Sequence, residues 1–547
     1  MAILKLKMKN KNMENKKEGI NNNMKKTKGI TLVALVITIV ILLILAGITI
    51  GTLTGENGLF TRAQQAKEKT IEAQKNEDET ISKYMEQIDE HIYLDYANGK
   101  WNENQKVNSP QLMEGMTGVY WDETGKEIEV TSENAKNWYN YDEQKWANAK
   151  TQDGSYWVWI PRYAYQIESG CYTNTAGKIS IKFLQGTSNK DSDGKEINTK
   201  YPTVTDGKMA DYVVHPSFTN GKANNYMNGE WDKELTGYWV AKYTAGYQEC
   251  TQTIAEDGSI TEPTTNTSNI KYSNKNYTND NSDYSTNAIS QNPSSLPQMS
   301  YPVFKPLTYA YNCITTGDIY TLAQEIAKTK EFYGLNSKQT DSHQMKNSEW
   351  GAVAYLTKSK YGRDEKEVTI NSKNMNDSSK NIYAVTGYAN STANDNSAST
   401  TNNKTGIFDL SGCVWEYTAG YVSNGNSSIN SYGKSYASVE TNSNGYKTLS
   451  TKYATVYPYD SSNLGATYNN LKSEIYGFGD AILETSTRSG GSNSWNSDYS
   501  GFPYSSGPFF LRGGYCSSGS GAGTFTLNAY NGVTSYSRGF RSVLVAL

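Results

Sequence analysis

An uninterrupted apolar run at residues 30–50 is the strongest feature of the hydrophobic and polar pattern of this chain. Its only polar side chains are hydroxyls, and at about 1.5 Å per residue its 21 residues would form a helix of roughly 31 Å. This length matches the ~30 Å hydrocarbon core of a bilayer, so the run predicts a transmembrane helix. The lysines of the basic leader 1–29 predict a cytoplasmic N-terminus and an extracellular remainder. A cleaved signal peptide is disfavoured, because the run is too long and no small-residue cleavage site follows.

The pattern changes twice after this run. Residues 51–92 favour an amphipathic stem helix, with apolar positions on one stripe at Leu59, Ala63, Ala66, Ile81, Met85 and Ile88. From Tyr93 onward, short apolar and aromatic runs alternate with Gly, Asn, Ser and Asp clusters, which is typical of strands and turns. The clearest predicted strands are 156–160, 237–243 and 539–545. The predicted fold class is therefore α+β, an N-terminal transmembrane and stem helix followed by a mixed head with long irregular insertions.

Composition divides the predicted head further. Residues 93–236 are expected to supply extra strands or a small subdomain, and 237–547 the main part of the head. Two segments rich in Ser, Thr, Asn, Gly and Tyr, near 251–300 and 424–500, are expected to be surface insertions, because they offer little apolar area to bury.

Charge and cysteine content exclude some classes of function. The net charge is −3, and a chain cut after Gly29 would keep 43 basic and 53 acidic residues, a net charge of −10. No basic stripe remains for nucleic acid. The five cysteines are odd in number and widely spread, which predicts neither a disulfide framework nor a paired-cysteine metal site. Most are expected to be small buried hydrophobic residues.

The basic leader, Gly29 and the run that starts at Ile30 resemble the N-terminal methylation segment of type IV pilins and pseudopilins. The resemblance implies cleavage by a prepilin peptidase between Gly29 and Ile30. The family usually carries glutamate at the fifth mature position, where it pairs with a neighbouring subunit, whereas this chain has Ala34. The resemblance thus predicts membrane targeting and processing, and leaves growth into a pilus with other pilins open. Met24 offers a second translation start.

A second resemblance rests on five segments in order over 238–547. They are similar to the formylglycine-generating-enzyme (sulfatase-modifying) domain, which has a C-type-lectin-like fold. The segments are an opening strand at 238–243, a helix at 346–356 similar to the family's T-x-x-E-W helix, a G-I-F-D-L-S-G-C-V-W-E-Y signature at 406–417, an R-G-G element within 511–515 and a G-F-R element within 538–541. Cys413 stands where the family usually has asparagine.

The same motif residues have a purely structural interpretation. Trp350, Trp415 and Phe540 suit apolar anchors of a core. Because isolated buried charges are costly, the charged motif residues are expected to be paired, namely Glu349, Glu416, Arg512 and Arg541. Gly513 and Gly514 suit tight turns.

Catalysis finds little support among these residues. Copper-dependent members of the family use two cysteines five positions apart after R-G-G, but here Cys516 is followed five positions later by Gly521. The three histidines are isolated from one another, so an iron site of three histidines is not expected either. Calcium is left open as a ligand, although no cage of Asp, Glu or Asn is legible, and we otherwise predict no cofactor and no metal.

Binding has positive support. Tyrosine is abundant, 43 residues, and it occurs beside Ser, Gly and Asn, the mixture used by recognition loops. An A+T-rich genome would raise Tyr and Asn without any selection for binding. In relatives diversified by a retroelement, the ligand face lies just before G-F-R. The corresponding candidates are Tyr515, Ser517, Ser518, Asn528, Tyr530, Asn531, Ser535 and Tyr536.

These observations predict a single-pass cell-surface protein whose head binds an extracellular glycan or protein without catalysis. The alternatives are a minor pseudopilin of a pilus or secretion system, and a tethered formylglycine-generating-type oxidoreductase.

Overall fold

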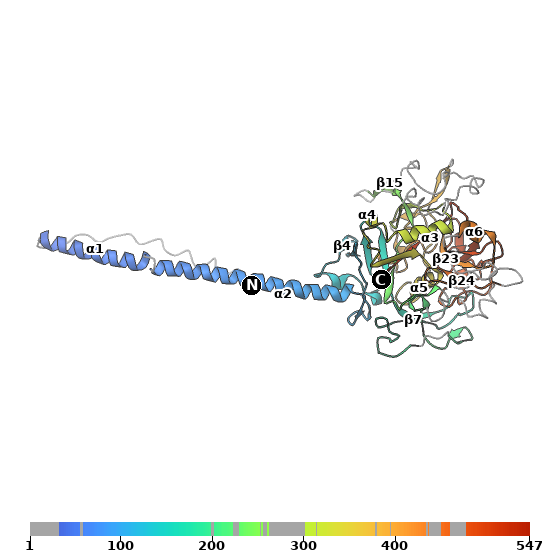
Figure 1. The fold of residues 1–547 in the computed structure, drawn as a ribbon, viewed down its shortest axis with the longest axis horizontal. Helices are drawn as coiled ribbons and strands as arrows, with labels where there is room; N and C mark the ends of the chain where they lie inside the picture. The colour runs from blue at the N-terminus through green and yellow to red at the C-terminus, as the bar shows by residue number, and fades with distance from the viewer. Residues whose placement is uncertain are drawn as a thin grey trace, which may run out of the picture. The chain divides into compact units, whose positions relative to one another are not determined.

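The computed structural model describes residues 32–54, 58–197, 202–221, 229–251, 253–254, 260–261, 301–312, 314–377, 380–393, 395–433, 436, 450–459 and 477–547. The chain divides into two compact units, Met1–Gln87 and Ile88–Leu547, and we call the second unit the head. The helices are α1 (Leu32–Thr54), α2 (Leu59–Ala97), α3 (Thr316–Glu325), α4 (Lys330–Tyr333), α5 (Asn347–Thr357) and α6 (Ser427–Tyr432) (Figure 1).

The predicted transmembrane helix is wrong, because no helix in the described part of the chain is long and apolar enough to cross a membrane. The basic leader 1–29 and the predicted cleavage site between Gly29 and Ile30 lie outside the described residues.

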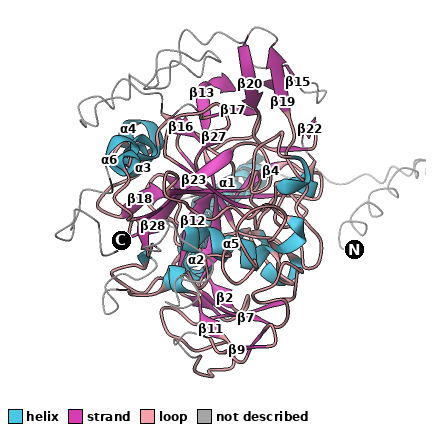
Figure 2. Ribbon diagram, turned by 90° about the vertical axis from the view of Figure 1, so that its right-hand side faces the viewer, coloured by secondary structure: helices cyan, strands magenta, loops and turns pink. Residues whose placement is uncertain are grey.

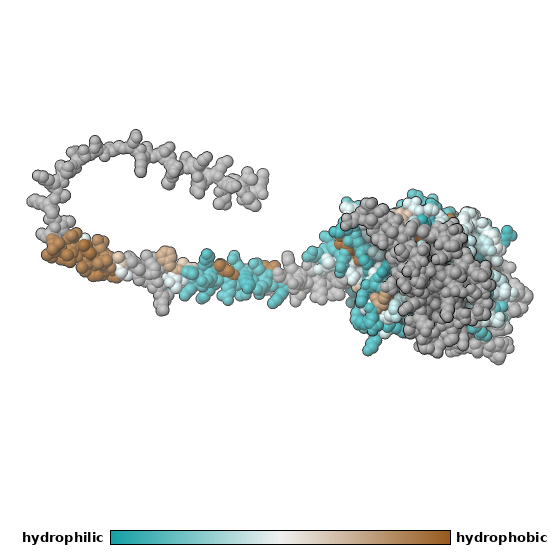
Figure 3. Space-filling view, turned by 90° about the horizontal axis from the view of Figure 1, so that it is seen from above, coloured by the Kyte–Doolittle hydropathy of each residue, from teal (hydrophilic) through white to brown (hydrophobic). Residues whose placement is uncertain are grey.

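The first unit has two helical surfaces of opposite character. Apolar side chains cover α1, whereas hydrophilic side chains dominate the coloured part of α2 (Figure 3). Helix α2 contains 39 residues, about 58 Å of helix, so the predicted stem helix continues to Ala97. Its apolar stripe is exposed at Leu59 and Ile81 in the single chain.

Helices are mixed with mainly antiparallel sheets in the head (Figure 2). The largest sheet has seven antiparallel strands in the order β18 (Thr340–Gln344), β28 (Ser542–Ala546), β12 (Gly237–Ala241), β6 (Tyr156–Pro161), β5 (Asn148–Thr151), β3 (Met116–Trp121) and β4 (Glu127–Glu129). Residues 93–236 thus supply β3–β6 to the same sheet as the C-terminal β28. Strands from the beginning and from the end of the head therefore pair in one sheet, which couples the two halves of the head.

A second sheet has the order β24 (Thr455–Tyr457), β23 (Trp415–Val422), β25 (Phe509–Arg512) and β26 (Leu527–Tyr530), with β27 (Arg538–Gly539) also paired to β23. Strands β24 and β27 run parallel to β23, and the other pairs are antiparallel. Because β27 precedes β28, the C-terminal segment links this sheet to the seven-stranded one.

Smaller sheets complete the head. Two have three strands, β11 (Val213–Val214), β7 (Tyr163–Ile167) and β8 (Ile179–Phe183), and β16 (Pro302–Val303), β13 (Gly246–Thr251) and β17 (Thr308–Ala310). The two-stranded pairs are β1 (Trp101–Asn102) with β2 (Val107–Asn108), β9 (Val204–Thr205) with β10 (Lys208–Met209), β14 (Thr253–Ile254) with β15 (Ile260–Thr261), β19 (Asn374–Asp377) with β20 (Lys380–Ala384), and β21 (Tyr388–Ala389) with β22 (Thr392–Ala393). Most of the expected insertion 251–300 lies outside the described residues.

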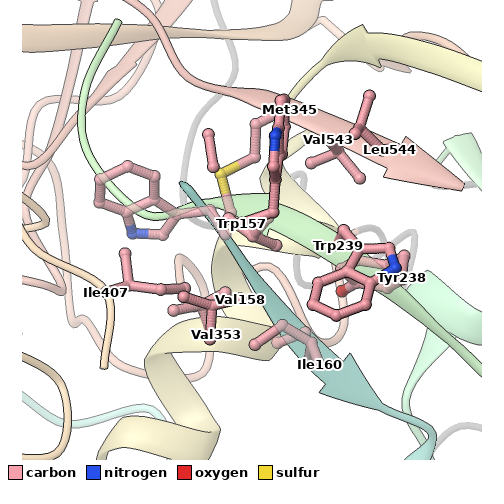
Figure 4. Close-up of a cluster of buried hydrophobic side chains, with 14 of the residues drawn as sticks. Trp157, Val158, Ile160, Tyr238, Trp239, Met345, Val353, Ile407, Val543 and Leu544 are labelled. Atoms are coloured by element: carbon pink, nitrogen blue, oxygen red, sulfur yellow. The ribbon is translucent and has the colours of Figure 1, made fainter. Parts of the chain in front are cut away.

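The core of the head forms where β6, β12, β28 and α5 meet (Figure 4). Trp157 on β6 and Trp239 on β12 are buried, and Val353 reaches the same cluster from α5. The rings of Trp159 and Trp239 meet edge to face at 5.3 Å between centroids. Both faces of β6 are covered, which explains why its sequence is a continuous apolar run instead of an alternating one.

Part of the segment 424–500 packs into this core. Ala481 and Trp495 are buried in it, whereas Ile482 and Leu483 are buried in a second cluster with Val422 and Phe510. Gly351 of α5 lies so close to Gly479 that a Cβ at Gly351 would sit 1.7 Å from the Gly479 carbonyl oxygen. The helix therefore packs directly on the backbone of a segment whose composition alone suggested a surface loop.

Candidate functional site

Glu416 and Arg541 form a fully buried ion pair that joins both sheets. Arg541 Nε and Nη2 donate to the two carboxylate oxygens of Glu416 at 3.1 and 2.9 Å. Its other donors reach the carbonyl oxygens of Ala241 at 2.6 Å and Phe408 at 2.8 Å. This two-pronged pair, in which all three guanidinium nitrogens donate, holds β12, β23 and the segment around Phe408 together. The ion pair therefore has a structural role, because each charged group is already bonded to the other and is not free to act on a ligand.

Arg512 has a similar role beside Trp350. Its three nitrogens donate to the carbonyl oxygens of Thr526, Asp480 and Ala481 at 2.9–3.0 Å. The guanidinium also lies over the Trp350 ring, 5.5 Å from its centroid. Arg512 therefore fixes the buried part of segment 477–498 against β25.

The glycines after Arg512 make the turn that this packing needs. Gly513 and Gly514 have φ values of +82° and +80°, which favour glycine. A Cβ at Gly514 would also lie 2.6 Å from the Cβ of Ala522. The other two aromatic motif residues also have a structural role, because Phe540 is buried in the core and Trp415 packs against it.

Glu349 belongs to a buried network of charges. It pairs with His343 Nε2 at 2.9 Å and with Lys346 Nζ at 3.3 Å, and Asp341 lies 3.4 Å from His343 Nδ1. Burial alone lowers the pKa of His343, but Glu349 and Asp341 outweigh it and raise the pKa overall. Burial raises the pKa of Glu349, but His343 and Lys346 reverse the direction and lower it. The network pairs its charged groups inside the head, where His343, Lys346 and Glu349 are completely buried.

The residues weighed for catalysis are placed apart. Burial lowers the pKa of His215 to about 3, so this ring is neutral at pH 7, and its Nε2 lies 3.0 Å from the Gly479 carbonyl oxygen. Gly521, at the second family cysteine position, lies on a short 3-10 turn after Cys516. Among residues whose placement is described, no group of three or more His, Cys, Asp or Glu could hold a metal ion.

The predicted ligand residues fall into two kinds. Four of them spend a side-chain oxygen on neighbouring backbone or hydroxyl groups, namely Ser518, Asn528, Asn531 and Ser535. Ser517 and Tyr530 are exposed, and Tyr515 and Tyr536 are half-buried. Burial raises the pKa of Tyr515, and the nearby charge of Tyr536 adds to the rise.

Tyr530 lies in a group that the sequence did not bring together. We call Tyr499, Tyr504, Tyr530 and Arg538 the tyrosine patch. The Arg538 guanidinium stacks on the Tyr530 ring, 3.6 Å from its centroid. Burial raises the pKa of Tyr504, with Tyr530 and Tyr499 adding to the rise and Arg538 opposing it. The three rings are 37, 46 and 37 % exposed at positions 499, 504 and 530.

Sequence reasoning missed Tyr499 and Tyr504. A local signal existed, because residues 499–507 have the same Tyr, Ser and Gly texture as the predicted face. The expected insertion 424–500 contains Tyr499, and Tyr504 lies just after it. Backbone bonds from Gly501 N to Leu527 O, 2.7 Å long, and from Leu527 N to Tyr499 O, 2.9 Å long, bring this segment beside β26.

A groove elsewhere on the head is a second candidate. It encloses about 250 Å³ and is lined by aromatic, amide and charged side chains, including Tyr120, Trp121, Glu123, Asn403 and Lys404. A smaller hollow shares Trp121, Asn396 and Lys404 with it. The Lys242 ammonium occupies a position 4.4 Å from the Trp121 ring centroid, so part of this ring is already in use.

Comparison with known proteins adds no relative. No family model matches this chain, and no curated protein matches it. The prepilin-type and formylglycine-generating-enzyme-like resemblances therefore stay predictions.

Proposed function

We propose that this is a non-catalytic cell-surface recognition protein whose head binds an extracellular ligand through the tyrosine patch. The observation that carries the proposal is the Arg538 guanidinium stacked on the exposed Tyr530 ring, with the exposed Tyr499 and Tyr504 on the loop that is hydrogen-bonded to the start of β26. Tyrosine and arginine are the residues that most often dominate binding energy at interfaces. Their rings and guanidinium suit either a glycan or a protein surface.

Rigidity of the patch supports the same proposal. Tyr530 ends β26, which pairs with β25 along its whole length from Phe509 to Arg512. Arg538 begins β27 and also donates to the Val533 carbonyl oxygen at 3.3 Å. A tyrosine on a paired strand loses little conformational entropy on binding, because few torsions remain to be fixed.

The contrast with the motif residues also favours binding over catalysis. Glu416, Arg541 and Arg512 use their polar groups inside the head. The tyrosine patch instead keeps aromatic area on the surface. Display outside the cell remains part of the proposal and does not depend on the patch geometry.

A glycan array and a panel of whole cells would test the proposal with the purified full-length chain. For any ligand found, Tyr504→Ala and Tyr530→Ala should each weaken binding about tenfold or more, as expected for central aromatic contacts. Tyr301→Ala is the matched control, because Tyr301 is 38 % exposed but precedes β16 in another sheet. Binding that survives both patch substitutions would reject the patch.

The groove provides the competing outcome. Trp121→Ala and Lys404→Ala change its wall and leave the tyrosine patch intact. If these substitutions abolish binding while Tyr504→Ala and Tyr530→Ala do not, the groove is the ligand site and the patch assignment is wrong.

One observation favours the second candidate, a subunit of a pilus or secretion machine. In the single chain, α1 exposes large apolar side chains along its described length, from Leu32 at 77 % to Ile48 at 59 %. Such a surface could pack against other pilin-like helices. Mass spectrometry of the mature N-terminus tests this candidate: a methylated chain starting at Ile30 supports it, and an unprocessed chain starting at Met1 or Met24 counts against it.

A further inference from the structure

Two cysteines separated by 103 positions lie side by side in the head. Cys516 N donates to the Cys413 carbonyl oxygen at 2.9 Å, and Gly412 N donates to the Gly513 carbonyl oxygen at 3.0 Å. These two backbone bonds hold segment 412–413 against the turn 513–516. Cys413 and Cys516 are therefore neighbours in space although they are far apart in sequence.

The backbone bond limits the distance between their Cα atoms. An N–Cα bond is about 1.46 Å, and standard bond lengths place a carbonyl oxygen about 2.4 Å from its own Cα. With the 2.9 Å hydrogen bond between them, the two Cα atoms are at most about 6.8 Å apart. Disulfides span about 4.4–6.8 Å between Cα atoms, so the chain already satisfies this requirement.

Both thiols belong to one small buried cluster. Its other members are Ala310, Ala384 and Val414, with the half-buried Tyr515 packed against it. Cys413 is completely buried and Cys516 is 6 % exposed, and both are free thiols here. Burial raises the pKa of the Cys413 thiol, with Asp409 and Cys516 adding to the rise. The two sulfur atoms therefore share one apolar environment, and Cys516 is the more accessible of them.

We propose that Cys413 and Cys516 form a reversible disulfide that fastens the start of segment 515–537 to the loop before β23. The oxidant is a small-molecule disulfide such as oxidised glutathione. The Cys516 thiolate attacks one sulfur of the oxidant and expels a thiolate, which takes up the proton that Cys516 lost. The Cys413 thiolate then attacks the Cys516 sulfur in this mixed disulfide and expels the second thiol. The protein loses two protons and two electrons, and the oxidant takes them up to become two thiols.

The cross-link has a consequence for the head. Tyr515, Ser517 and Ser518 are sequence neighbours of Cys516. The disulfide would therefore fix the start of segment 515–537, which leads to Arg538. Any effect of this cross-link on ligand binding rests on the proposed function. Formation of the disulfide does not, so the disulfide and the proposed function can be refuted separately.

Peptide mapping of the full-length chain tests the bond. The reduced protein is incubated in oxidised and reduced glutathione at pH 8.5, alkylated, digested and analysed by mass spectrometry. We expect a linked pair of peptides containing Cys413 and Cys516, two hydrogen atoms lighter than the separate peptides, and its loss after dithiothreitol. Cys516→Ser and, separately, Cys413→Ser should abolish it. Cys171→Ser, which changes a buried cysteine elsewhere, should leave it intact.

Two results would overturn the proposal. One is that, after incubation in every one of the glutathione mixtures and subsequent unfolding, both Cys413 and Cys516 are fully alkylated, which would show that no disulfide had formed. The other is a link from Cys516 to Cys171, Cys250 or Cys313 in place of Cys413. Because the readout is the native chain's own peptides, a variant that fails to fold cannot decide the outcome.

Discussion

The Glu484 carboxyl should make the head lose stability as pH rises from about 4.5 to 7. Glu484 is completely buried and accepts hydrogen bonds from the Tyr165 hydroxyl at 2.7 Å, the Tyr355 hydroxyl at 2.6 Å and Gly479 N at 2.7 Å. Burial raises its pKa from 4.5 to about 7, although the three hydrogen bonds oppose the rise. The groups that act on this pKa include no cation.

The sign and size follow from proton linkage. The folded chain holds the Glu484 proton more tightly than the unfolded chain, so the full stabilisation is present below the unfolded pKa. It is lost as pH rises through the folded pKa. A pKa moved from 4.5 to about 7 corresponds to roughly 3 kcal/mol of unfolding free energy across that window.

Glu484→Gln removes the titration while keeping the shape. The amide oxygen can still accept from Tyr355 and Gly479 N, and the amide nitrogen can donate to the Tyr165 hydroxyl. We therefore expect the variant to gain stability relative to the wild type by roughly 3 kcal/mol between pH 4.5 and pH 8. Asp480 should reinforce the gain, because burial raises its pKa to about 7 and Glu484 adds to that rise.

Urea unfolding at several pH values measures this difference. Glu133→Gln, which changes an exposed carboxyl, serves as the control and should track the wild type at every pH. A difference between Glu484→Gln and wild type that stays constant from pH 4.5 to pH 8 would refute the reasoning.

Three further predictions concern the ion pair, the R-G-G turn and another buried carboxyl. Arg541→Met should cost about 3–5 kcal/mol in urea unfolding, because it leaves Glu416 buried without its partner. The double variant Glu416→Gln with Arg541→Met should cost less than the single one, and an equal or larger cost would argue against an uncompensated charge. Gly514→Ala should lower the thermal midpoint more than Gly519→Ala, because both sites have positive φ but only Gly514 lacks room for a Cβ. An equal fall in the thermal midpoint of the two variants would contradict this, and would show that the backbone strain from positive φ accounts for both effects. Asp498→Asn should also flatten the fall in stability with rising pH, because burial raises the Asp498 pKa from 3.8 to about 8; an unchanged pH profile of unfolding would contradict this assignment.

Local sequence determined the elements whose pattern is strong over several residues. The runs at 156–160 and 237–243 predicted strands that the structure has as β6 and β12, because apolar β-branched and aromatic residues suit a buried strand. Glu349 three positions after Lys346 accepts from the Lys346 N–H at 2.9 Å, a contact that begins α5. The interpretation of Glu416 and Arg541 as paired charges also follows from residue type, since a lone buried charge is too costly.

Tertiary structure decided what depends on contacts between distant segments. Composition could not show that 477–498 is partly buried, because only its packing on α5 and Arg512 creates the apolar surroundings. Spacing in sequence could not reveal the tyrosine patch or the Cys413 and Cys516 pair, since backbone bonds between separate loops bring them together. Hydropathy alone overestimated the N-terminal run as a membrane span. Local pattern fixes which face of an element is apolar, whereas neighbours far along the chain fix which side chains meet.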